Sequence, residues 1–135
     1  MRNLLIPVIA ASALVSAIAL VSTTALGDEK ITPVLKTNLQ GMDGMEANIL
    51  LVEVDPGFQT ERHLHPGHVF IYVMEGTVEI DLDGEEPVRV SAGEAVYELP
   101  NKPMVGRNAS SAEGARFVLF QIGPTGEPLE IAQPQ

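Results

Sequence analysis

The chain has 135 residues, with 18 acidic and 8 basic side chains, so its formal net charge at pH 7 is −10. Such an acidic chain argues against nucleic acid and anionic membranes as partners, because both repel negative charge. The sequence contains no cysteine, so no disulfide can stabilise the fold. A chain of this length can bury one hydrophobic core, and we expect a single small domain.

The N-terminus has the order of features that is typical of a secretory signal peptide. A short basic start precedes the apolar run Leu4–Val21, and small residues follow the run. Ala25 and Gly27 suit the positions that precede a cleavage site, so we expect cleavage before Asp28, with cleavage after Ala25 as the second choice. The mature protein would then be periplasmic or secreted. An uncleaved membrane anchor is the alternative, since the run approaches the ~18 residues that can span a bilayer.

The rest of the chain, residues 28–135, alternates short apolar segments with turn residues, which predicts an all-β domain. Thr77–Leu82 alternates most clearly, and Asp83-Gly84 after it is a strong hairpin signal. Val69–Met74 is a nearly continuous apolar run, as expected for a strand that is buried on both faces. We expect a sandwich or barrel with its core at about residues 46–123 and a loose tail from Glu127 onwards. The other expected strands are Ile49–Val54, the segment around Val88 and Val90, Ala95–Leu99 and Arg116–Ile122.

Two histidines separated by one residue stand out ahead of the apolar run. His63 and His65 would point to the same face of a strand, because successive side chains alternate between the two faces. Two imidazoles aimed at one spot suit zinc, iron, nickel or copper. The pair is therefore the strongest indication of a metal site in the sequence.

This segment resembles the first of the two sequence motifs of the cupins, and a later segment at the matching distance resembles the second. The resemblance implies a cupin double-stranded β-helix, a jelly-roll barrel, over most of the chain after the N-terminus. It also implies a divalent metal held by the two histidines, a glutamate and a distant third histidine. The residues in register are Gly57, His63, His65 and Gly76 in the first motif and Gly93 and Asn108 in the second, with Pro100 one place from its motif position.

Two of the four ligand positions differ from the cupin pattern. Val69 stands at the position of the glutamate and Met104 at that of the distant histidine, and no histidine follows His68. Glu98 is the best candidate for a third ligand, because a buried unpaired carboxylate would be costly without a metal or a shared proton. Alternatively, its strand turns Glu98 towards solvent. His68 is the other candidate, because the chain can curl after Pro66-Gly67.

The sequence thus predicts an interior site for a divalent transition metal (Fe, Mn, Ni, Zn or Cu), a small organic ligand, or both. The family resemblance implies a cupin with dioxygenase-like or isomerase-like chemistry, or a cupin that binds a small molecule without metal or has a structural role. It also implies a homodimer, since cupins often pair through their sheets. The N-terminal pattern adds that this cupin is exported. No catalytic residue or substrate follows from the sequence. The candidate metal ligands are His63, His65, Glu98 and His68, and the candidate pocket residues are Val69, Met104, Tyr97 and Gln59.

Overall fold

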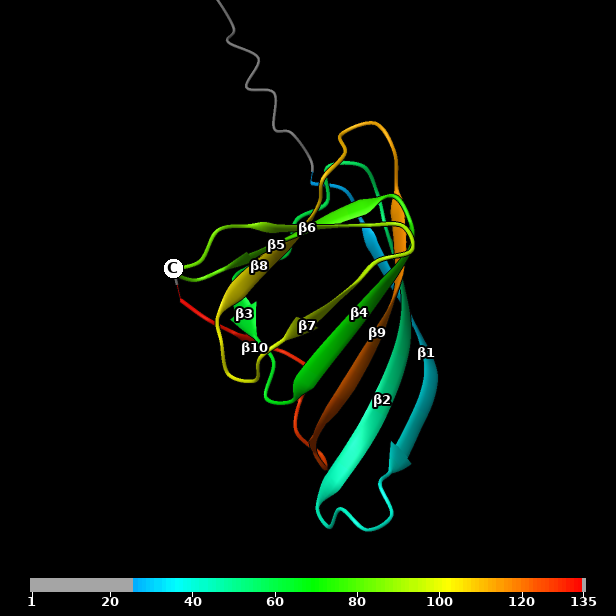
Figure 1. The fold of residues 1–135 in the computed structure, drawn as a ribbon, viewed down its shortest axis with the longest axis vertical. Coiled ribbons are helices and arrows are strands. Elements are labelled where there is room, and N and C mark those ends of the chain that lie inside the picture. The colour runs from blue at the N-terminus through cyan, green and yellow to red at the C-terminus, as the bar shows by residue number, and fades with distance from the viewer. Residues whose placement is uncertain (1–25, 135) are drawn as a thin grey trace, which may run out of the picture.

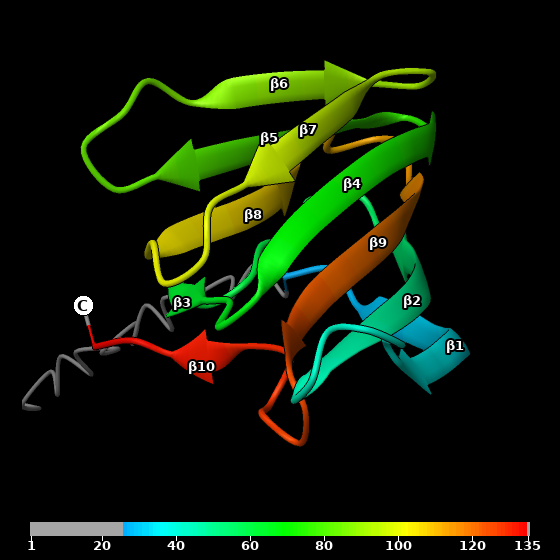
Figure 2. The ribbon, with the colours of Figure 1, turned by 60° about the horizontal axis from the view of Figure 1, so that its bottom comes forward.

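A computed structural model describes residues 26–134, so nearly all of the expected signal peptide lies outside the described residues. Two antiparallel sheets face each other in this part of the chain, as Figures 1 and 2 show. The first sheet contains, in spatial order, β1 (Glu29–Asn38), β2 (Met45–Val54), β9 (Ala115–Pro124), β4 (His68–Glu75) and β7 (Ala95–Glu98). The second contains β10 (Ile131–Ala132), β3 (His63–Leu64), β8 (Met104–Asn108), β5 (Thr77–Leu82) and β6 (Val88–Ser91). The all-β jelly roll expected from the sequence is confirmed. Across residues 26–134, no helix is long and apolar enough to cross a membrane.

The core lies between the two sheets, where alternate residues of each strand are buried. In β4, Val69 and Val73 are fully buried, whereas Phe70 and Tyr72 between them are exposed on the outer face. The expectation that this strand is buried on both faces was therefore wrong. On the outer face the ring of Phe70 stacks on Tyr97, with centroids 5.0 Å apart, and this contact covers part of the exposed apolar surface. The expected homodimer stays a prediction.

Both ends of the described chain extend the sheets beyond the expected core. β1 pairs with β2 along its whole length and forms one edge of the first sheet. At the other end, Ile131 pairs with Leu64, and the backbone N–H of Gln133 donates to the Arg62 carbonyl at 2.9 Å. The C-terminal segment, expected to be loose, is thus an edge strand. It lies beside β3, which carries one of the two histidines (Figure 2).

Glycines fix the chain on both sides of β4. A side chain at Gly67 would collide with the backbone of Ile122, so β9 can approach closely just after the histidine pair. Gly76 has φ 77°, a conformation that favours glycine, and a Cβ there would lie 2.7 Å from the Gly114 carbonyl oxygen. These two positions let the chain pass from β3 through the first sheet and back to the second.

Candidate metal centre

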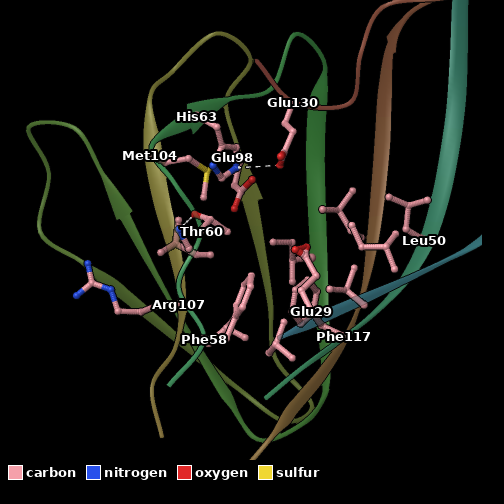
Figure 3. A pocket seen from close by; sticks show the side chains of 18 of the residues that line it. Glu29, Leu50, Phe58, Thr60, His63, Glu98, Met104, Arg107, Phe117 and Glu130 are labelled. Atoms are coloured by element: carbon pink, nitrogen blue, oxygen red, sulfur yellow. Dashed lines mark hydrogen bonds and ion pairs between the residues drawn. The ribbon is translucent and has the colours of Figure 1, made fainter. Parts of the chain in front are cut away.

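The two sheets enclose a cavity of about 100 Å³, with room for several waters or a small organic molecule. Its walls are mainly apolar. Figure 3 shows His63, Met104 and Glu98 together at one end of this cavity, with Phe58 and Phe117 towards the other. A few polar groups gathered at one end of an apolar cavity are typical of a ligand site.

Backbone carbonyls fix the tautomers of both histidines. His63 Nδ1 lies 2.9 Å from the Glu61 carbonyl oxygen, and His65 Nδ1 lies 2.7 Å from that of Leu129. Because a carbonyl oxygen only accepts, each Nδ1 must carry the proton and donate it. In the neutral rings each Nε2 is then left with a free lone pair, which is the form that binds a metal.

These two lone pairs face each other. The distance from His63 Nε2 to His65 Nε2 is 3.3 Å, and both side chains are buried. Two neutral acceptors at this distance repel unless a cation lies between them, either a proton on one ring or a metal ion. Burial lowers the pKa of His65, against a smaller opposing effect of the Leu129 carbonyl. The lowered pKa disfavours a proton on His65 Nε2, so a metal ion is the better candidate for the cation between the two rings.

Glu98 supplies a carboxylate at the same place. Its side chain is 1% exposed, and its Oε2 lies 3.7 Å from His65 Nε2. Neither carboxylate oxygen has a hydrogen-bond partner within residues 26–134. Burial alone raises the pKa of Glu98 to about 7. A buried carboxylate that accepts no hydrogen bond is unstable as an anion unless a cation pairs with it.

The position of Glu98 explains how the site differs from the cupin pattern. Val69 and Glu98 are directly opposite each other on the neighbouring strands β4 and β7, and both side chains point inwards. The carboxylate therefore comes from β7, one strand away from the position that the family motif uses. The predicted placement of Val69 inside the barrel is consistent with this pairing.

The donor atoms fit a divalent transition metal. Two donors that are each about 2.1 Å from one ion lie about 3.4 Å apart at the tetrahedral angle, close to the separation of the two Nε2 atoms. The Glu98 distance is slightly longer, so the carboxylate would have to move inwards by a few tenths of an ångström. Without such a movement, residues 26–134 contain no group of three or more His, Cys, Asp or Glu side chains close enough together to hold a metal.

Of the other predicted site residues, only Met104 lies at the histidines. Met104 is buried, lines the cavity and pairs with His63 across β8 and β3. His68 and Tyr97 are exposed on the outer face of the first sheet, where the Tyr97 hydroxyl contacts His68 Nδ1. Gln59 is exposed and bridges to Arg107 at the backbone. The structure therefore does not bring these last three side chains to the cavity: His68 begins β4 facing outwards, so it does not curl back as the sequence allowed.

Three residues near the site were not predicted from the sequence. Leu129 and Glu130 line the cavity from the C-terminal segment, and no pattern in the sequence indicates that position. Gln121 pairs with Val69 from β9, is 3% exposed, and has a side-chain oxygen without a hydrogen-bond partner among the described residues. A glutamine inside the apolar run 117–122 was a visible signal, since buried polar side chains need partners.

Comparisons with known proteins agree with the fold and the motif. The Cupin domain model matches residues 50–120, more than half of the chain. No curated protein sequence matches the chain. A cupin-like protein of Thermotoga maritima is similar in structure, with a TM-score of 0.66 and 18% identity over 81% of this chain and 78% of that one.

Two enzymes have similar structures over part of their length. The DMSP lyase DddQ of Ruegeria pomeroyi gives a TM-score of 0.61 and 18% identity, with 78% of this chain and 51% of the lyase covered. An oxalate oxidase in complex with the substrate analogue glycolate gives 0.60 and 20%, with 76% and 54% covered. This chain thus spans about half of either enzyme, and the likeness shows a shared fold. The match to the Cupin domain model establishes that the chain belongs to the cupin family.

Proposed function

We propose that this cupin binds a divalent transition metal through His63, His65 and Glu98, and that the cavity beside the metal takes up a small organic molecule. The observation that carries the proposal is the convergence of two imidazole lone pairs and an unpartnered buried carboxylate. Each of these groups only accepts, and a cation satisfies all three at once. A bound ion would act as a Lewis acid on an oxygen of the organic molecule.

The donor set favours some metals over others. Two histidines and one carboxylate are the ligands that non-haem iron oxygenases use, with further positions left open. Manganese, nickel and zinc accept the same nitrogen and oxygen donors. The apolar walls, which include Leu50, Ile71 and Phe117, would exclude water and hold the organic molecule against the metal end of the cavity. This arrangement supports dioxygenase-like chemistry ahead of isomerase-like chemistry.

Calorimetric titration of the chelator-treated protein with Zn²⁺ tests the proposal. The parent should bind one equivalent, and the His63→Ala/His65→Ala variant should bind none, because both imidazole ligands are gone. His68→Ala is the matched control: this side chain lies on the outer face, so the variant should bind like the parent. A parent that takes up no metal, or equal losses in the control and the double variant, would rule the site out.

A metal-free ligand-binding cupin is the second candidate. It is favoured by the apolar lining and by the absence, within residues 26–134, of a closely gathered set of three metal ligands. In that case a proton on one imidazole, balanced by Glu98, would take the place of the metal. A small molecule that raises the melting temperature equally with and without EDTA would favour this candidate.

Export is also part of the proposal. The backbone nitrogen of Asp28 lies 3.3 Å from Asp55 Oδ2. Cleavage before Asp28 would turn this nitrogen into a charged α-amino group that can pair with the Asp55 carboxylate. β1 begins at the next residue, so the mature chain would start directly at the fold. N-terminal sequencing of protein from the periplasm or medium should begin at Asp28, whereas an intact Met1 on membrane-bound protein would contradict export with cleavage.

A further inference from the structure

We propose that Glu130, carried by the C-terminal segment, is a fourth ligand of the metal. The inference rests on the proposed function, since it concerns the same ion. Neither cupin motif includes this residue, because the second motif ends at Asn108. If it holds, the chain completes its ligand set with two carboxylates in place of the motif glutamate and the distant histidine.

The Glu130 carboxylate lies close to one of the two imidazoles. Its Oε2 lies 3.8 Å from His63 Nε2, the contact drawn as a dashed line in Figure 3. On the other side, Glu98 lies 3.7 Å from His65 Nε2. The two imidazole nitrogens are thus flanked by one carboxylate each, at almost the same distance. An ion between the two rings would have both carboxylates within a short movement.

The chain around Glu130 is attached to both histidines. The Leu129 carbonyl accepts the Nδ1–H of His65, and Ala132 pairs with His63 across β10 and β3. Glu130 lies between these two attachments and lines the cavity. Its backbone is therefore held at the site, although its side chain is 65% exposed and free to move.

The charges at the cavity also favour Glu130 as a ligand. Glu98 and Glu130 together would neutralise a divalent ion bound by two neutral imidazoles. Without the ion, Glu29, Glu98 and Glu130 place three carboxyl groups around one cavity, where like charges repel each other. A cation relieves this repulsion, and two oxygen donors favour iron, manganese or zinc over copper(I).

Titration of the chelator-treated full-length protein with Zn²⁺ tests the inference. Glu130→Ala should weaken binding about tenfold or more, since loss of even an indirect partner of a metal ligand typically has an effect of 10–100-fold. Glu127→Ala removes an exposed carboxylate from the same segment and should leave the affinity unchanged. Because both side chains are exposed, neither variant should alter folding, which melting curves without metal would verify.

Hydrogen exchange supplies a readout that a general charge effect would not move. Zn²⁺ should increase protection of the amides of residues 129–133 in the parent and in Glu127→Ala, but not in Glu130→Ala. Equal affinities and equal protection in Glu130→Ala and the parent would overturn the inference and leave the three-ligand site intact. A parent that binds no Zn²⁺ would overturn the proposed function and this inference together.

Discussion

In the absence of metal, Glu98→Gln should become more stable relative to the parent as pH rises. The free energy of unfolding of the variant minus that of the parent should increase by about 3 kcal/mol between pH ~4 and pH ~9. Burial raises the pKa of Glu98 to about 7 in the folded state, against 4.5 for a water-exposed glutamate in the unfolded chain. The folded protein therefore binds this proton more tightly than the unfolded chain does. The parent loses stability as pH rises from 4.5 through 7, whereas glutamine does not titrate.

Chemical denaturation of both proteins in EDTA at several pH values measures this difference. The lowered pKa of His65 destabilises the folded state on the acidic side, in both proteins alike, so its effect largely cancels. Glu86→Gln is the control, because Glu86 is exposed in the hairpin between β5 and β6. A difference that stays constant over this pH range would mean that Glu98 is not buried as an unpaired acid.

Moving the Glu98 carboxylate to the neighbouring strand should preserve metal binding, whereas removing it should weaken binding at least tenfold. Val69 and Glu98 are opposite each other in register, and cross-strand neighbours have Cβ atoms about 5 Å apart. Glu98→Val should therefore lose affinity, and the exchange Val69→Glu/Glu98→Val should recover most of it. The exchange keeps the net charge and nearly the same side-chain volume, so it isolates the position of the carboxylate.

Calorimetric titration with Zn²⁺ compares the affinities of the parent, Glu98→Val and the exchange variant. Val69→Glu alone is a useful third variant, because it places two carboxylates side by side and should destabilise the metal-free protein. If the exchange variant folds but binds no better than Glu98→Val, residue 69 does not face the histidines. The correspondence between Val69 and the motif glutamate would then be wrong.

The sequence was most informative where side-chain pattern alone determines structure. The alternation in Thr77–Leu82 matches β5 at both ends, and Gly84 has the positive φ that the Asp83-Gly84 turn signal implies. The spacing of His63 and His65 placed both rings on one side, as the 3.3 Å contact between them requires. Glu98 was identified as a candidate ligand because burying a carboxylate without a partner is costly.

Other features depend on contacts between distant segments, which periodicity does not encode. β4 has apolar residues on both faces, so the pattern did not reveal that Phe70 and Tyr72 face solvent. The C-terminal segment attaches through backbone groups, such as the Leu129 carbonyl that holds His65. Backbone attachments leave no mark on the order of polar and apolar side chains, so Glu130 could not be placed beside His63 from the sequence.

The most direct test of the metal centre is anomalous diffraction from crystals of the protein soaked with Zn²⁺, recorded on both sides of the zinc absorption edge. We expect one strong anomalous peak at bonding distance, about 2.1 Å, from Nε2 of both His63 and His65, with the Glu98 carboxylate as a third ligand. A peak only at the exposed His68, or none between the two imidazoles at saturating Zn²⁺, would contradict it.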